Sequence, residues 1–219
     1  MLNMATTGAA GQKTIRLYRE GDRAAVYDIC VRTGDHGDDA TGMFEHPDLL
    51  PDIYAGPYLC LEPSLCFVLD DGSGDGTGGR PAGYVLGTAD TARFVTEYRQ
   101  RWLPGVVTRY PPPPGPPAGP EDELLAALYC PERMLVPELG AYSAHLHIDL
   151  LPGYQGGGYG RRLMETFLDA VAKAGASGVH VVVAEANTKA HGFYLRMGFE
   201  EVPVEHAPGV VYYGRKTVM

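Results

Sequence analysis

The sequence predicts a single α/β domain built from short strands and amphipathic helices. Its 219 residues are enough for one well-buried core and few for two domains of ordinary size. From Ala141 onward, β-rich runs alternate with stretches in which apolar residues recur at helical spacing. Hydrophobic residues make up 45% of the chain, a content typical of a folded globular domain.

The N-terminal part is expected to form a tail, a strand and a helix. Residues 1–13 lack the apolar stretch of an export signal and read as a disordered tail. Thr14–Tyr18 is a short β-like run, and after a turn apolar residues recur at helical spacing over residues 24–30. Because segment 33–42 is too rich in Gly and Asp for the interior of an element, we expect a loop there, a candidate for function.

The middle of the chain is expected to hold short elements and a proline-rich insertion. The predicted elements are a helix over Pro47–Ala55, strands over Ser64–Asp70 and Ala82–Thr88 joined by a long mobile tip, and helices over Ala92–Trp102 and Glu121–Leu128. The proline tract 111–117 separates the last two helices. Too little chain lies on either side of the tract for two cores, so we expect one domain over residues 14–219 with an insertion at about 91–137.

The pattern is sharpest in the last third of the chain, which shows no internal repeat. It predicts strands over Ala141–Leu150 and Val179–Ala184, helices over Gly158–Ala174 and Lys189–Met197, and final strands over Glu200–Val204 and Val210–Lys216. A glycine-rich turn joins the first strand to the first helix. This turn is the most informative part of the sequence.

Charge and composition argue against several classes of function. Lys plus Arg number 18 against 27 Asp plus Glu, and the net charge of -9 has the wrong sign for a nucleic-acid or anionic-membrane partner. No uninterrupted apolar stretch approaches the ~18 residues that a membrane span needs. The four cysteines are widely spaced, which predicts reduced, mostly buried thiols in a cytoplasmic protein.

The glycine-rich turn has the features of a pyrophosphate cradle. Its glycines are Gly156, Gly157, Gly158 and Gly160. They remove side chains where a ligand could approach the backbone, and the free N–H groups of the following helix start point at that ligand. The turn matches neither a P-loop nor a dinucleotide fingerprint, because no Lys-Ser or Lys-Thr follows the helix start and the glycines of the turn lack the G-x-G-x-x-G spacing. Gln155–Gly160 instead fits the pattern Q/R-x-x-G-x-G/A.

This pattern, between a strand and a helix, resembles the acetyl-CoA loop of the GCN5-related N-acetyltransferase (GNAT) superfamily. Ala186–Phe199 is similar to the superfamily's downstream element N-x-x-A-x-x-F-Y-x-x-x-G-F. From about residue 14 the chain also resembles the acetyltransferase-like C-terminal domain of O-GlcNAcase, in which the cofactor loop is degraded. The resemblance implies a mixed, mostly antiparallel sheet, splayed where acetyl-CoA enters, with helices on both faces.

The resemblance also implies a set of cofactor contacts. Gln155, Gly156, Gly157, Gly158, Tyr159, Gly160 and Arg161 would hold the pyrophosphate of acetyl-CoA as cosubstrate. The backbone N–H of Leu150 or Leu151 would polarise the acetyl carbonyl. Asn187 would contact the cofactor, although an asparagine there is also a routine helix N-cap.

Tyr194 is the tyrosine of the downstream element and the predicted general acid. A phenol has an ordinary pKa of about 10, so at neutral pH it keeps a proton to donate to a departing thiolate. A core aromatic beside Phe193 and Phe199 is the alternative interpretation.

The predicted strand before the turn carries the candidate base. Alternation places His145, His147 and Asp149 on one face of this strand. Asp149 is the preferred group to accept the amine proton or contact the substrate, and His147 is the alternative base. His-x-His-x-Asp also begins a metal-ligand pattern, but Leu150 stands where that pattern expects a further His, so we expect no metal site.

The function predicted is direct acetyl transfer from acetyl-CoA to an amine of a small molecule or a protein lysine. The rival is a non-catalytic acyl-CoA-binding or protein-interaction module. For the acceptor side, Asp35, Asp38 and Asp39 offer either an acidic wall or a solvated loop. Trp102, Tyr110 and the proline tract offer a lid or platform, a family-specific insertion, or the surface of a homodimer.

Overall fold

A computed structural model describes residues 12–73, 78–112 and 115–217. The expected N-terminal tail lies outside this part of the chain, apart from Gln12 and Lys13. The strands are β1 (Thr14–Leu17), β2 (Cys66–Asp70), β3 (Pro81–Thr88), β4 (Ala144–Leu150), β5 (Gly178–Ala184), β6 (Glu200–Val202) and β7 (Val210–Lys216). The helices are α1 (Arg23–Arg32), α2 (Leu49–Tyr54), α3 (Gly56–Leu61), α4 (Thr91–Glu97), α5 (Leu103–Val106), α6 (Pro120–Tyr129), α7 (Tyr159–Lys173) and α8 (Thr188–Arg196).

The strands form one sheet in the order β1-β2-β3-β4-β5-β7-β6. All neighbouring strands are antiparallel except β4 and β5, which are parallel and pair only at Ala144 with Val179 and at His145 with His180. Beyond His145 the two strands separate. The predicted mostly antiparallel sheet with a central splay is therefore confirmed.

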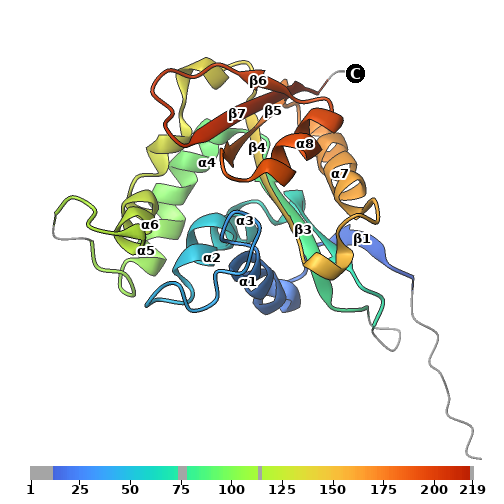
Figure 1. Cartoon of the computed structure of the whole chain (residues 1–219), viewed down its shortest axis with the longest axis horizontal. Coiled ribbons are helices and arrows are strands. Elements are labelled where there is room, and N and C mark those ends of the chain that lie inside the picture. Colours follow the sequence, from blue (N-terminus) through green and yellow to red (C-terminus); the bar gives the residue numbers. More distant parts are fainter. Residues whose placement is uncertain (1–11, 74–77, 113–114, 218–219) are drawn as a thin grey trace, which may run out of the picture.

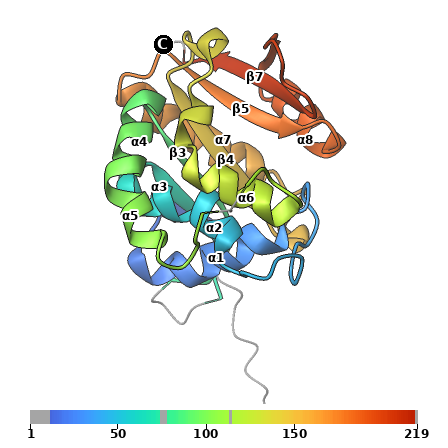
Figure 2. The same ribbon diagram turned by 90° about the vertical axis from the view of Figure 1, so that its left-hand side faces the viewer.

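Helices cover both faces of this sheet, as predicted (Figure 1). Cys66, Val68, Tyr84 and Leu86 point to one side, where they share a core with α1 to α6. The residues between them in β2 and β3 point to the other side, where a second core includes α7 and α8. Figure 2 shows the helices of the first group packed together over the sheet.

The helix α7 follows from a simple pattern in the sequence. Leu163, Met164, Phe167, Leu168 and Val171 lie on one face and are buried against the sheet. Gly158 precedes the helix with φ of 80°, a left-handed conformation that a glycine adopts without strain. The helix therefore begins where the glycine-rich turn ends.

Two aromatic side chains of the segment between α4 and α6 belong to the core rather than to a lid. Trp102 and Tyr110 are buried: the Trp102 indole donates to the carbonyl of Asp52 at 2.9 Å, and the Tyr110 hydroxyl donates to the Asp52 carboxylate at 2.6 Å. The expectation that these two aromatics form a lid or platform is wrong, because α2 and Asp52 take them into the interior. Residues 113–114 of the proline tract lie outside the described part.

The four cysteines are free thiols. Cys30 and Cys66 are buried, as expected, whereas Cys60 and Cys130 are exposed. None of them lies in the glycine-rich turn or in α8.

Candidate functional site

A cavity of about 510 Å³ opens where β4 and β5 separate. We call it the splay cavity. Its walls are the end of β4, the glycine-rich turn, one face of α8, and the loop after α1. The lining residues predicted from the sequence are Asp149, Leu150, Gln155, Gly156, Gly158, Gly160, Arg161, Asn187 and Tyr194.

Three predicted residues do not line the splay cavity. The N–H of Leu151 donates to the carbonyl of Ala82 at 3.0 Å and so continues the pairing of β4 with β3. The prediction that this N–H polarises a substrate carbonyl is therefore wrong. The side chain of Tyr159 packs against the core, and the roles of Gly157 and Tyr159 as backbone ligands stay predictions.

The register of β4 directs the backbone N–H of Leu150 toward β5. In an antiparallel pair, successive residues direct their backbone groups alternately to the two sides of the strand. Since Leu151 is bonded to β3, the Leu150 N–H points the other way, toward β5. The pairing with β5 has ended at His145, so this N–H faces the gap between the strands.

The glycine-rich turn presents a helix N-terminus to the cavity. Gly156 and Gly158 both have positive φ, 75° and 80°, which favours glycine at these two positions. The first N–H groups of α7, at Tyr159 to Arg161, have no partner within the helix. The Gln155 side chain donates to the carbonyl of Leu150 at 2.9 Å and ties the turn to the end of β4. Backbone donors and helix dipole together suit a pyrophosphate.

Sequence reasoning missed two cations in this cavity. Lys189 and Arg196 line it from α8, on the same helix face as Phe193, and join Arg161 from the turn. Lys189 and Arg196 lie four residues before and three residues after Phe193, a spacing that places all three side chains on one face of a helix. The sequence therefore contained a signal for this pair of cations. In a chain with a net charge of -9, three cations around one cavity favour an anionic ligand.

Asp149 faces the splay cavity and is held by a buried tyrosine. The Tyr84 hydroxyl donates to its carboxylate at 2.6 Å. Burial raises the pKa of Asp149 to about 6, although the Tyr84 hydrogen bond acts in the opposite direction. Asp149 is therefore a carboxylate at neutral pH with a proton affinity above that of an ordinary aspartate.

His145 and His147 share the predicted face of β4 but belong to a different network. Thr91 donates its hydroxyl proton to the carbonyl of Ser143, so its oxygen accepts from His145 Nδ1 at 2.8 Å. His145 Nε2 then accepts from the Tyr58 hydroxyl at 2.7 Å, and the Tyr58 oxygen accepts from His147 Nε2 at 3.2 Å. Burial lowers the pKa of His147 to about 4, so this histidine is neutral at pH 7.

Tyr194 is both a packed core aromatic and a lining residue of the splay cavity. It packs edge-on against Phe193 and Phe199, with ring centroids 5.3 and 5.5 Å away, and is buried. It also lines the splay cavity. Burial, and to a lesser extent the charge of Asp149, raises the pKa of Tyr194 above its ordinary value, so the phenol keeps its proton.

Asn187 serves as a helix cap at the edge of the cavity. Its side-chain oxygen accepts from the N–H of Ala190 at 3.1 Å, which fixes the start of α8.

The loop after α1 contributes Thr33, His36 and Gly37 to the same cavity. Asp35, Asp38 and Asp39 do not line it, which favours the solvated-loop interpretation over an acidic wall.

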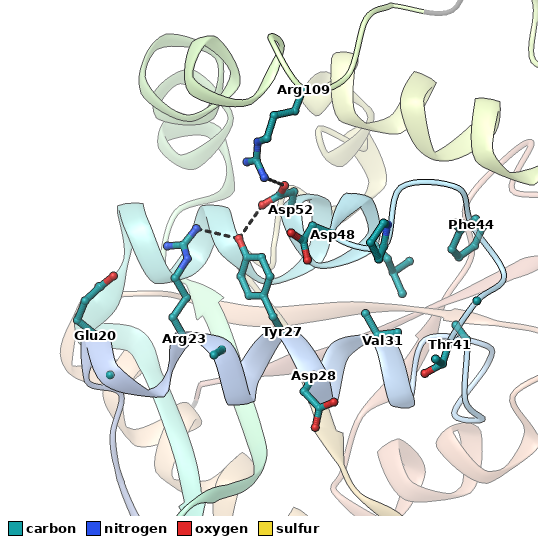
Figure 3. A pocket seen from close by; sticks show the side chains of 16 residues that line it. Glu20, Arg23, Tyr27, Asp28, Val31, Thr41, Phe44, Asp48, Asp52 and Arg109 are labelled. Atoms are coloured by element: carbon teal, nitrogen blue, oxygen red, sulfur yellow. Dashed lines mark hydrogen bonds and ion pairs between the residues drawn. The ribbon is translucent and has the colours of Figure 1, made fainter.

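A larger cavity of about 730 Å³ lies between α1 and the segment containing α2 (Figure 3). No predicted site residue lines it. Asp52 accepts from Tyr27 at 2.7 Å and pairs with Arg109 at 2.8 Å, and Arg23 donates to Tyr27 at 2.8 Å. These side chains satisfy one another, so the network stabilises the contact between helices.

The described residues form neither a metal-binding cluster nor a membrane-spanning helix. Over 12–73, 78–112 and 115–217, no group of three or more His, Cys, Asp and Glu side chains is placed to hold a metal ion. Within the same ranges, every helix is too short or too polar to cross a bilayer.

The fold and the splay cavity are those of an acetyltransferase domain, and the chain belongs to the acetyltransferase (GNAT) family. The family model matches residues 121–199, which include the glycine-rich turn and α8. The protein is thus an acyltransferase, as the sequence motifs predicted.

The relatives extend this match over nearly the whole chain. The crystal structure of SsHAT is 53% identical, with a TM-score of 0.89 over 94% of this chain and 99% of that chain. O-GlcNAcase of Rattus norvegicus is 30% identical over 208 residues, which are 92% of this chain and 22% of that protein. The chain therefore spans about a fifth of the length of this relative. Ard1 from Thermoplasma volcanium, at 15% identity and a TM-score of 0.55 over 94% of this chain and 99% of that one, shares the fold.

Proposed function

We propose that the protein is an acetyl-CoA-dependent N-acetyltransferase that transfers the acetyl group directly to an amine. One observation carries this proposal. The glycine-rich turn, Leu150, Asp149 and Tyr194 all line the splay cavity. These are the groups that direct transfer requires: an anchor, a carbonyl polariser, a base and an acid.

The cofactor side of the cavity fits the charge of acetyl-CoA, which supplies an activated acetyl thioester when bound. The N–H groups at the start of α7 and the Arg161 side chain would hold the pyrophosphate. Lys189 and Arg196 supply further positive charge on the opposite wall. The Leu150 N–H would polarise the acetyl carbonyl.

Asp149 and Tyr194 divide the proton transfers. Asp149 takes the proton from the attacking amine as the new N–C bond forms, and Tyr194 donates to the sulfur as the C–S bond breaks. With a pKa of about 4, His147 is the weaker base of the two candidates on this strand face. No cysteine lines the splay cavity in the described part of the chain, which favours direct transfer over an acyl-enzyme.

Titration calorimetry with acetyl-CoA, beside free CoA and NADH, tests the cofactor assignment. We expect micromolar binding of acetyl-CoA and at least tenfold weaker binding by the Gly158→Ala variant. Gly158 has positive φ, a conformation that costs an alanine about 1–2 kcal/mol. We expect the backbone of the variant to shift to relieve this strain, which displaces the N–H groups of the turn. Gly153→Ala, in the preceding turn where an added Cβ meets nothing, is the matched control. Absence of binding by the wild type would favour the non-catalytic interaction module instead.

A second test concerns the hydrogen bond from Tyr84 to Asp149. That bond favours the charged carboxylate, so Tyr84→Phe should raise the pKa of Asp149 further. The rising limb of the kcat/KM profile should move from near pH 6 to higher pH, with activity approaching wild type at alkaline pH. Profiles from pH 5 to 9 measure this. Tyr98→Phe is the control, because the buried Tyr98 hydroxyl has no hydrogen-bond partner among the described residues. If the kcat/KM profiles of the wild type and of Tyr84→Phe superimpose, Tyr84 does not tune the pKa of Asp149.

A further inference from the structure

A third cavity, of about 380 Å³, lies on the side of β4 and β5 that faces α2 and α3. We call it the histidine cavity, because His145, His147 and His180 line it. Its walls also include Tyr54 and Tyr58 from the helices, Tyr212 from β7, and the segment around Arg133. No site residue predicted from the sequence lies among them, apart from the alternative base His147.

The histidine cavity and the splay cavity share the strand β4. Residues 145–147 line the first and residues 148–150 line the second. His147 and Asp149 are two positions apart on one strand face, about 6.6 Å along the strand. The two cavities therefore follow one another along β4, with His147 in the wall of the first and Asp149 in the wall of the second. An acceptor long enough to extend from the first into the second would bring its amine to Asp149.

Arg133 gives the histidine cavity its charge. The three histidines are neutral at pH 7, because burial lowers the pKa of each of them. Among the described lining residues, Arg133 is then the one side chain that carries a charge. The cavity is thus positive in a protein whose net charge is -9.

The charge of Arg133 has no protein counter-ion in the described part of the chain. Its guanidinium lies 5.6 Å from the centroid of the Tyr54 ring, and its Nε donates to the carbonyl of Ala127 at 3.4 Å. The neighbouring acid, Glu132, is paired with Arg99 at 2.6 Å. An arginine held against an aromatic ring, with its fork unpaired, suits a carboxylate ligand.

The remaining walls favour an apolar or aromatic body. Tyr54, Tyr58 and Tyr212 present rings, and Val182 on β5 is 52% exposed on this surface. Apolar walls with one charged group that fixes orientation are typical of small-molecule sites, and a volume of about 380 Å³ suits a ligand the size of an amino acid.

We propose that the acceptor is a small amine with an aromatic or apolar body and a carboxylate, bound in the histidine cavity with its carboxylate against Arg133. The inference rests on the proposed acetyl transfer and names its substrate class. The proposal favours a small molecule over a protein lysine as the source of the amine. A lysine-rich protein tail would bring positive charge next to the positive Arg133, and the two would repel.

Matched amine pairs test this assignment. We compare 4-(aminomethyl)benzoate with benzylamine, and 4-(2-aminoethyl)benzoate with phenethylamine, because the first member of each pair carries its amine and its carboxylate at opposite ends. Acetylation is followed as CoA release with saturating acetyl-CoA. The wild type should prefer the carboxylate partner of each pair by about tenfold to a hundredfold in kcat/KM, the range of a charge-assisted hydrogen-bonded pair. Arg133→Gln should abolish the preference while the acetyl-CoA Kd stays unchanged. Arg99→Gln, whose charge lies outside the cavity, should keep it.

A binding measurement separates this proposal from the proposed activity. Titration of 3-phenylpropanoate, which has the carboxylate but no amine, should give binding that Arg133→Gln weakens at least tenfold. Such binding without turnover of any amine would support the site and overturn the transferase assignment. Equal or faster turnover of the carboxylate-free amines or of a lysine peptide would overturn the acceptor class and leave the transferase standing. Absence of both binding and carboxylate preference would also overturn the acceptor class.

Discussion

Replacing Asp149 by Asn should lower kcat by about a hundredfold to ten-thousandfold, the range expected when a general base is removed. Asparagine has nearly the shape of aspartate and can still accept the Tyr84 hydroxyl, but it cannot take a proton from the amine. The acetyl-CoA Kd should stay within a few-fold of wild type, because the phosphate cradle is untouched. Steady-state kinetics with an accepted amine, together with calorimetry, measure the two quantities.

The pH dependence supplies an independent check on the base. The pKa of Asp149 is raised to about 6, so its carboxylate is present above pH 6 and is lost as the pH falls through that value. Wild-type kcat/KM should follow this limb, and the Asp149→Asn variant should lose it. If Asp149→Asn keeps wild-type turnover and the same rise of kcat/KM near pH 6, the general base is another group. The His147→Gln variant then tests whether His147 is that base.

The same pKa predicts that the variant remains folded. A carboxyl whose pKa rises on folding binds protons more tightly in the native state, so its ionised form costs stability above about pH 6. Removing the charge should therefore leave Tm at pH 7 equal to wild type or slightly higher. Loss of activity with an unchanged Tm assigns the effect to chemistry rather than to unfolding.

The local patterns of the sequence predicted most of the elements that form the site. Period-two alternation placed His145, His147 and Asp149 on one face of β4. The structure confirms that face, because the three side chains bond to Tyr58 and Tyr84 of the first core, whereas the alternate residues of β4 pack in the second core. The glycines identified the turn before α7, because a positive φ at Gly158 is a local property of the chain. Asn187 was recognised as a cap for the same reason.

Features that depend on distant residues could not be predicted this way. The N–H of Leu151 is committed by its register with Ala82 on β3, and Tyr84, which holds Asp149, lies 65 positions away. The helix α3 was not predicted, because the helix predicted over Pro47–Ala55 was followed directly by the strand from Ser64. In the fold, the Cα of Gly56 instead backs onto Tyr27 and Trp102, a close approach that a side chain would block.

Buried charge explains the error about the insertion. Trp102 and Tyr110 read as an exposed platform because they neighbour a proline tract. Both side chains are buried because they donate hydrogen bonds to the fully buried Asp52. Trp102 donates to its carbonyl and Tyr110 to its carboxylate. The sequence around Asp52 carries no local signal of that requirement, since its partners come from α1 and from residues beyond position 100.

Replacing Tyr194 by Phe should lower turnover by about tenfold to a thousandfold while the acetyl-CoA Kd stays within a few-fold. The ring contacts with Phe193 and Phe199 survive the change, so the packing of α8 is kept. Only the hydroxyl that donates to the departing sulfur is removed. Comparison of kcat, Kd and Tm between variant and wild type measures these effects.

Tyr213→Phe is the matched control for Tyr194. The Tyr213 ring stacks on Tyr194 at 6.2 Å, but its hydroxyl is bonded to His191 Nδ1 at 2.9 Å and the residue does not line the splay cavity. This control loses a hydroxyl from the same aromatic cluster and should keep wild-type turnover. If Tyr194→Phe also keeps it, Tyr194 is not the acid. If Tyr194→Phe instead loses acetyl-CoA binding, the hydroxyl shapes the cavity and Tyr194 has a packing role.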